Sequence, residues 1–257
     1  MRQFIVIICL LFSGAVAAKC ERTLKVGIGT EWPPYVMYAD ERAFGLDVEI
    51  TEHVLKQAGL CFTFVNLPSS ARGINELEKG EVDILPSASF NTERAKIAFF
   101  SEPYRRERMR LFSLSPDERA RNLQELFAAD YIFTANPGAY YGEELADILK
   151  IDWYKKRFFE VASVDRRMQM VALGRVNYLI EDEMSGLYFV HKLGYDKIKL
   201  HSYVVNDNAI HFMLSRKTFN EVQVRQINDA LSMVLPTVIA LQLKYIPNYH
   251  QLADKDQ

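Results

Sequence analysis

Apolar residues along the first third of the chain alternate between short runs and helical spacing. Three apolar runs are typical of short buried strands: residues 24–28, 62–65 and 82–85. Between them, residues 50–58 and 74–77 have helical spacing, and each pattern ends at a glycine, Gly59 or Gly80. Asp47 is the expected N-cap of the first helix. This order predicts parallel strands with right-handed crossovers.

The rest of the chain repeats the α/β pattern. Further strands are predicted at residues 131–133, 178–180 and 209–214, and further helices at residues 143–150, 166–173 and 219–243. Pro236 should kink or divide the last helix. No linker composition separates the two halves, so we expect the chain to cross between them as strands.

The N-terminus has the pattern of a signal peptide over residues 1–18. Arg2 is followed by the apolar run 4–12 and then by small residues up to Ala18. A buried N-terminal strand is the alternative. No other long apolar run exists, so we expect an exported, periplasmic protein that does not span the membrane.

Two cysteines remain after the predicted signal peptide. Cys20 and Cys61 each precede a predicted strand, and they would lie at the same end of the sheet if those strands are parallel neighbours. Since disulfides persist in exported proteins, we predict a Cys20–Cys61 bridge. Two free buried thiols are the alternative.

Composition excludes several classes of function. Hydrophobic residues make up 49% and charged residues 25%, and the net charge of −2 argues against nucleic acid as a partner. The five histidines have no metal-ligand spacing. Gly27-Ile28-Gly29 lacks the third glycine of a dinucleotide fingerprint. We therefore expect no metal, no cofactor and no enzyme activity.

Residues 87–94 form the loop with the clearest potential chemistry. Ser87 and Ser89 offer hydroxyl groups, and Arg94 offers the planar guanidinium that binds a carboxylate through two hydrogen bonds. Alternatively, the Ser and Thr residues cap the next helix and Arg94 is solvated.

Five motifs in order resemble one known family. They are Thr30-Glu31-Trp32-Pro33-Pro34-Tyr35, Gly45-Leu46-Asp47-Val48-Glu49-Ile50, Leu77-Glu78-Lys79-Gly80-Glu81-Val82-Asp83, Asn91-Thr92-Glu93-Arg94-Ala95 and Phe100-Ser101-Glu102-Pro103-Tyr104. The chain resembles the type II periplasmic solute-binding proteins, which include the polar amino-acid-binding proteins of ABC transporters. A weaker match covers residues 174–183.

The resemblance implies a two-lobed α/β fold with a ligand cleft between lobes joined by two crossing strands. The crossings should fall near residues 108–114 and 205–213. Lobe 1 would comprise residues 19–110 plus 208–257, and lobe 2 residues 111–207.

The resemblance also implies a binding site. Arg94 would bind the α-carboxylate of the ligand, helped by Ser87, Ser89 and the backbone N–H groups at Gly138. Trp32 would stack on the ligand side chain, unless it is a core aromatic.

Asp182 would contact the α-ammonium group from lobe 2. A helix N-cap is the alternative role for Asp182, and Glu181 and Glu183 are neighbouring candidates.

Three positions depart from the family pattern. Ala139 and Tyr140 follow Gly138 where the family has Ser or Thr, and Tyr140 could either narrow the cleft or pack under lobe 2. Ser69 and Ser70 replace the usual second aromatic, although Arg72 is kept as a candidate binding residue. Asn177 stands where Asp is common. The ligand could therefore differ from a standard amino acid.

Residues 105–110 alternate charged side chains through a predicted crossing strand. A solvated strand face is the favoured interpretation, and an anion-attracting rim of the cleft is the alternative.

Together, these features imply a monomeric protein that captures a small zwitterionic ligand, an amino acid or a related compound, for an ABC permease. Two other functions share the scaffold. One is a cyclohexadienyl dehydratase, for which Glu31, Glu181 and Glu183 are candidate acids. The other is the input module of a sensor.

Overall fold

The computed structural model describes residues 20 and 22–245. The strands are β1 (Thr23–Ile28), β2 (Met37–Ala39), β3 (Arg42–Phe44), β4 (Cys61–Asn66), β5 (Ile84–Ser89), β6 (Ala98–Phe100), β7 (Arg105–Ser113), β8 (Phe133–Ala135), β9 (Phe158–Glu160), β10 (Tyr178–Asp182) and β11 (Lys199–Ser215). The helices are α1 (Leu46–Gln57), α2 (Ser70–Lys79), α3 (Thr92–Ile97), α4 (Leu123–Ala128), α5 (Glu143–Ile148), α6 (Asp152–Lys155), α7 (Val164–Ala172), α8 (Glu183–Lys192), α9 (Glu221–Met233) and α10 (Leu235–Tyr245). The predicted signal peptide lies outside the described residues.

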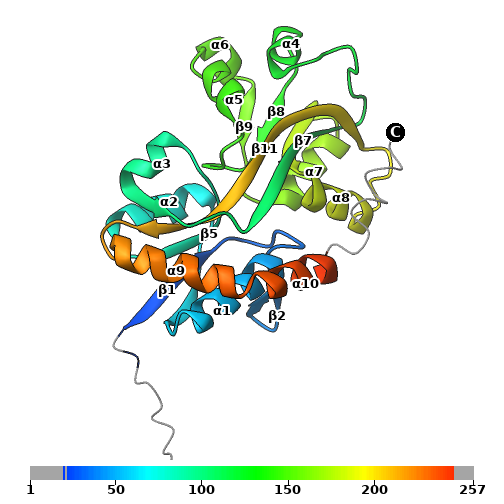
Figure 1. Cartoon of the computed structure of the whole chain (residues 1–257). Helices are drawn as coiled ribbons and strands as arrows, with labels where there is room; N and C mark the ends of the chain where they lie inside the picture. The colour runs from blue at the N-terminus through cyan, green and yellow to red at the C-terminus, as the bar shows by residue number, and fades with distance from the viewer. Residues whose placement is uncertain (1–19, 21, 246–257) are drawn as a thin grey trace, which may run out of the picture.

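One sheet of nine strands runs through the molecule (Figure 1). Its strand order is β4-β1-β5-β11-β7-β10-β8-β9, and β6 pairs with β11. β1 pairs in parallel with both β4 and β5, as the strand–helix–strand pattern predicts. The register sets Thr23 opposite Cys61, and the predicted Cys20–Cys61 disulfide is present, with its Cα atoms 5.9 Å apart.

The long strands β7 and β11 pair antiparallel and connect the two halves seen in Figure 1. The predicted crossings near residues 108–114 and 205–213 overlap them. The lobe boundaries themselves stay a prediction.

The hydrophobic core is divided to match the two halves. One cluster gathers side chains from β1, α1, α9 and α10, and a second gathers side chains from α4, β8, α5 and β10. Trp32 packs against the first cluster and also against a third cluster around α7 and α8. The fold is therefore the predicted two-lobed α/β architecture, with Trp32 at the junction.

The start of α1 differs from the prediction. Gly45, not Asp47, is the N-cap residue, and its φ of 123° favours glycine. A Cβ atom at Gly45 would lie 2.5 Å from the carbonyl oxygen of Tyr35. The N-cap prediction for Asp47 is wrong because its carboxylate turns inward and pairs with Arg105. At the other end of the chain, Pro236 stands in the first turn of α10, where α9 has just ended, so the predicted division is confirmed.

The charged run of β7 is not a solvated strand face, and that interpretation is wrong. Successive side chains of a strand point to opposite faces of the sheet. Arg105 and Glu107 are buried, whereas Arg106 between them is exposed. The side chains on one face of this charged segment are therefore buried in the interior of the molecule, and those on the other face are more exposed.

Within the described residues, none of the helices has the length and apolar character needed to cross a bilayer.

Candidate functional site

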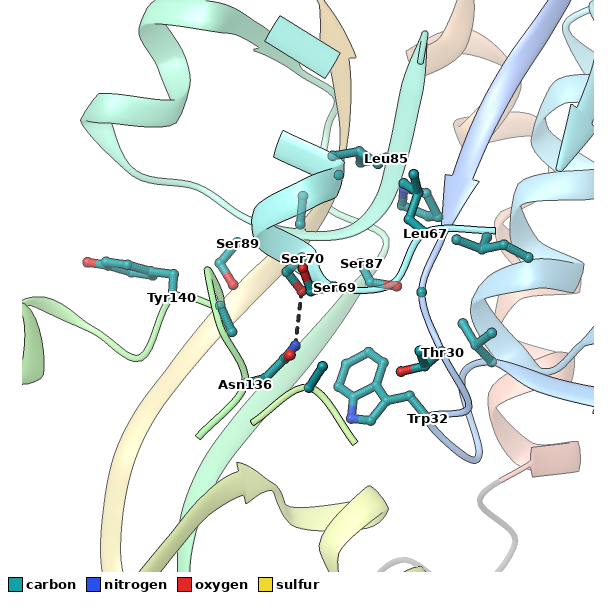
Figure 2. Close-up of a pocket in the computed structure, with 18 of the residues that line it drawn as sticks. Thr30, Trp32, Leu67, Ser69, Ser70, Leu85, Ser87, Ser89, Asn136 and Tyr140 are labelled. Carbon is teal, nitrogen blue, oxygen red and sulfur yellow. Dashed lines mark hydrogen bonds between the residues drawn. The ribbon is translucent and has the colours of Figure 1, made fainter. Parts of the chain in front are cut away.

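A cavity of about 150 Å³ lies between the two halves of the molecule, and Figure 2 shows its lining. One half contributes Thr30, Trp32, Ser69, Ser70, Ser87, Ser89 and Arg94. The other contributes Asn136, Tyr140, Arg167 and Glu181, and Glu107 comes from the connecting strand β7. The cavity thus has an aromatic ring, hydroxyl groups and charges of both signs in its walls.

Arg94 spans the cavity wall rather than pointing to solvent. Asn91 caps α3 through its side chain, and Arg94 follows in the first turn. Arg94 Nη1 donates to the carbonyl oxygen of Ser89, and Nη2 donates across the cleft to the carbonyl oxygen of Gly138, both at 2.8 Å. Since a guanidinium has five N–H groups, donors remain for a ligand carboxylate.

Ser87 lies at the cavity edge in a constrained conformation. Its φ of 60° falls in the left-handed region, which is uncommon for a residue other than glycine. Its Oγ donates to the carboxylate of Asp47, and its N–H donates to Tyr104 Oη at 2.8 Å. The Ser87 hydroxyl is therefore held by the protein, and Ser89 has the freer side chain.

Asp47 and Arg105 form a buried ion pair beneath Ser87. Arg105 Nε and Nη2 donate to the two carboxylate oxygens of Asp47 at 2.7 and 2.6 Å. The Arg105 guanidinium also lies 4.0 Å from the centre of the Tyr35 ring. This pair fixes the end of β5 from which Ser87 and Ser89 extend.

The carboxyl group of Glu107 lines the cavity and is weakly hydrogen-bonded to the protein. The residue is 4% exposed, and its carboxyl makes one long hydrogen bond, 3.5 Å, with Ser89 Oγ. Among residues 22–245 it forms no ion pair. Burial raises the pKa of Glu107 to about 8; nearby Arg105 lowers it, while the carboxylates of Asp182, Asp47 and Glu181 raise it further.

Glu181 and Arg167 form the charged wall on the opposite side. The guanidinium of Arg167 pairs with Glu181 and also donates to the carbonyl oxygen of Ala162 at 2.8 Å. Trp32 Nε1 donates to Glu181 Oε1 at 2.9 Å. Trp32 therefore both lines the cavity and joins the two halves.

Asp182 does not line the cavity. It is buried, and its Oδ1 accepts a hydrogen bond from the N–H of Ser185 at 3.0 Å, so it caps α8. Burial raises the pKa of Asp182 to about 7, against the opposing effect of Arg105. Asp182 therefore occupies the helix N-cap position that was the alternative to ligand binding, and its neighbour Glu181 lines the cavity.

Arg72 and Gly138 also lie differently from the arrangement that the family resemblance implies. The Arg72 side chain is 55% exposed and pairs with Glu76 at 3.1 Å, one turn further along α2. Gly138 offers its carbonyl oxygen to Arg94, while its N–H is 3.4 Å from Glu160 Oε1. Neither residue is part of the cavity lining.

Direct contacts close the cleft beside Gly138. Asn136 Nδ2 donates to Ser70 Oγ at 3.0 Å (Figure 2), and the N–H of Ala71 donates to the carbonyl oxygen of Pro137 at 3.1 Å. The two serines that replace the family's second aromatic thus have separate roles. Ser69 caps α2, and Ser70 forms the hydrogen bond to Asn136 across the cleft.

The two tyrosines after Gly138 have different roles. Tyr141 packs in the core of its half, and its hydroxyl accepts from the N–H of Asn136. Tyr140 lies at the margin of the cavity, and its ring points away from Trp32 (Figure 2).

The three acids considered for dehydratase chemistry are all engaged by cations. Glu31 pairs with Lys192, Glu181 with Arg167 and Glu183 with Arg110. Over the part of the chain that the structure describes, no three His, Cys, Asp or Glu side chains gather as a metal site would require.

Sequence reasoning missed Glu107, Arg167 and Asn136. The alternation of residues 105–110 was the available signal for Glu107, because it places every second charge on one face. Nothing local distinguishes Arg167, which follows an N-cap serine on an ordinary amphipathic helix.

The sequence of this chain is similar to a family of solute-binding proteins and to part of a sensor protein. The family model of the bacterial extracellular solute-binding proteins, family 3, matches residues 24–240. The virulence sensor protein BvgS of Bordetella pertussis is 20% identical over 180 residues, which is 70% of this chain but 14% of BvgS. The chain therefore spans a small part of that relative.

Two solved structures share the fold. A histidine kinase sensor domain with similarity to periplasmic binding proteins superposes with a TM-score of 0.75 and 19% identity, over 87% of this chain and 96% of that one. ArtJ from Geobacillus stearothermophilus, an arginine-, lysine-, histidine-binding protein, has a TM-score of 0.73 and 16% identity, over 87% and 95%.

Proposed function

The chain belongs to family 3 of the bacterial extracellular solute-binding proteins, and from this membership we propose that its cleft captures a small zwitterionic ligand, an amino acid or a related compound. The observation that carries the proposal is the cavity itself, whose lining includes Arg94, the carboxyl groups of Glu107 and Glu181, and the ring of Trp32. Such a lining suits a molecule with a carboxylate and a cationic nitrogen. The protein acts as an exported periplasmic monomer that delivers its ligand to an ABC permease.

Capture depends on the placement of the charges. Arg94 belongs to the first half of the chain, whereas Glu181 and Arg167 belong to the second. A ligand that contacts both sides therefore favours the closed arrangement over an open one, because only the closed state offers all the contacts. The Ser70–Asn136 hydrogen bond and the Trp32–Glu181 hydrogen bond add to closure.

Replacement of Arg94 by alanine is expected to reduce ligand affinity by more than about 2 kcal/mol, or roughly 30-fold, because the ligand carboxylate loses its charged donor in a desolvated site. Thermal unfolding in the presence of each of the twenty L-amino acids identifies the ligand, and calorimetry then gives the affinity. A ligand at 100 times its Kd adds about 2.7 kcal/mol to stability, which shifts Tm by several degrees.

Arg72→Ala is the matched control, since it removes an arginine that is exposed and paired with Glu76. We expect this variant to bind like the wild type. The carboxylate assignment fails if Arg94→Ala binds as well as Arg72→Ala does.

A sensor module is the second candidate, supported by the likeness to BvgS and to the histidine kinase sensor domain. Both functions begin with the same ligand-binding step, so they differ only in the fate of the liganded protein. Deletion of the gene should abolish uptake of the labelled ligand if the protein serves a permease. Unchanged uptake with an altered transcriptional response to the ligand would assign it to signalling instead.

We propose binding without catalysis. Cations engage the three acids that the sequence offered for dehydration, which leaves Glu107 as the cavity acid that a dehydratase would use. Formation of product from prephenate or arogenate by the purified protein would contradict this.

A further inference from the structure

Within residues 22–245, the cavity contains one buried carboxyl group that forms no ion pair, although Arg94 and Arg105 lie near it. This group belongs to Glu107, which is 4% exposed and whose one hydrogen bond in that range is the long one to Ser89 Oγ. Glu181, the other buried acid in the lining, already pairs with Arg167, and Glu31 pairs with Lys192 at the exposed edge. A buried carboxyl without a partner is costly to ionise, and a ligand cation removes that cost.

Ser89 places Glu107 next to the expected carboxylate site. The carbonyl oxygen of Ser89 accepts from Arg94 at 2.8 Å, and its Oγ contacts Glu107 Oε2 at 3.5 Å. Arg94 and Glu107 therefore flank the same residue. The α-carboxylate and α-ammonium groups of an amino acid are attached to the same carbon, so their binding groups must be close neighbours.

Asp182, which the family resemblance suggested as the partner of the ammonium group, instead caps helix α8. Its Oδ1 accepts from the N–H of Ser185 as the cap of α8, and the residue lies outside the cavity lining. A carboxylate that satisfies a helix N-terminus behind the cavity wall is poorly placed to reach a ligand.

We propose that Glu107, on the connecting strand β7, binds the α-ammonium group of the ligand, while Asp182 serves to cap α8. This inference rests on the proposed function, because it assumes that an amino-acid-like ligand enters the cleft. In this assignment the ligand is bound by the connecting strand β7 as well as by residues from the two halves of the molecule.

If Glu107 binds the ammonium group, ligand binding should release a proton from its carboxyl group. Burial raises the pKa of Glu107 to about 8, so the carboxyl is mostly protonated at pH 7 in the empty cleft. The groups that face it are Arg105 on its own strand, Asp47 on α1, Arg94 on α3, Glu181 and Asp182 on β10, and the phenols of Tyr35 and Tyr141. Pairing with an ammonium group requires the carboxylate, so binding releases close to one proton at pH 7.

The experiment compares two ligands on three proteins. The ligands are the tightest-binding of the twenty L-amino acids and its α-desamino acid, which keeps the carboxylate and lacks the ammonium group. The proteins are the wild type, Glu107→Gln and Asp182→Asn, and titration calorimetry gives each affinity. Glutamine has the shape of a protonated Glu107, and asparagine preserves a helix cap at position 182.

We expect Glu107→Gln to weaken binding of the amino acid by about 10- to 100-fold, which is the range for a hydrogen bond to a charged group. Affinity for the desamino acid should not change, and Asp182→Asn should bind both ligands like the wild type. The opposite result, loss in Asp182→Asn with retention in Glu107→Gln, overturns the assignment and leaves the proposed function intact.

A measurement on the wild type alone covers the case in which a variant fails to fold. Calorimetry at pH 7 in phosphate and in Tris, buffers with different ionisation enthalpies, counts the protons released. Close to one proton for the amino acid and none for the desamino acid supports the role of Glu107, and the same non-zero release for both ligands overturns it. If neither ligand releases a proton, Glu107 is already ionised, and equal affinities for the two ligands then overturn the role. If no amino acid binds the wild type, the proposed function fails and this inference with it.

Discussion

Replacement of Arg105 by methionine is expected to lower the free energy of unfolding by about 3 to 5 kcal/mol, which is the usual cost of breaking a buried ion pair from one side. The side chains of Arg105 and Asp47 are 3% and 0% exposed, and two hydrogen bonds of 2.7 and 2.6 Å join them. Methionine keeps much of the apolar volume but leaves the Asp47 carboxylate buried without its cation. Urea unfolding monitored by fluorescence gives the difference.

The neighbouring Arg106 provides the matched control. It pairs with Asp207, but the two side chains are 67% and 41% exposed, so the pair contributes no more than about 1 kcal/mol. Arg106→Met should therefore remain close to the wild type. Equal losses for the two variants would mean that the burial of Arg105 has no energetic consequence.

The double variant Arg105→Met with Asp47→Leu separates two explanations of the loss. Replacing both members of a buried pair by apolar residues is often far less costly than removing one. We expect the double variant to recover part of the stability. It will not recover all of it, because Ser87 loses the acceptor that holds its hydroxyl group.

The fold could be predicted well where local pattern and topology agree. The alternation of strands and helices implied parallel neighbours, and the pairing of β1 with β4 and β5 confirms it. The same inference placed Cys20 and Cys61 together, and the disulfide follows from that parallel register. Pro236 marked the break before α10 because proline cannot continue the hydrogen-bond ladder of a helix.

The site was less predictable because it depends on which face of an element is covered. Residues 105–110 carry charges on both faces of β7, so period-two alternation separates Arg105 and Glu107 from Arg106 without showing which set is buried. That choice depends on Asp47, which packs from α1 some 58 residues earlier in the chain. Asp47 itself was misassigned as a helix cap for the same reason.

The acids on β10 illustrate the same limit. Glu181 and Asp182 are adjacent in sequence, and a strand sends adjacent side chains to opposite faces. Family resemblance favoured Asp182, but Asp182 caps α8 while Glu181 reaches the cavity and Trp32. A one-residue difference in position along the strand therefore decides which carboxylate lines the cavity, and sequence alone cannot fix it.

Glu107→Gln is expected to be more stable than the wild type at alkaline pH, by roughly 5 kcal/mol well above pH 8. Burial raises the pKa of Glu107 to about 8 in the folded state, compared with about 4.5 for an exposed glutamate. Between these values the folded wild type binds a proton that the unfolded chain does not. Its stability therefore falls as the pH rises, by up to about 1.4 kcal/mol per pH unit, and glutamine removes that loss.

Unfolding free energies measured from pH 5 to pH 9 test this, with the difference between the two proteins small at pH 5 and largest above pH 8. Asp182→Asn is a second test, because burial also raises the pKa of Asp182, to about 7, so this variant should likewise become more stable relative to the wild type as the pH rises. Parallel curves for the wild type and Glu107→Gln would mean that Glu107 is ionised in the empty cleft. In that case ligand binding would release no proton from it, and the cleft would meet a ligand with its negative charge already in place.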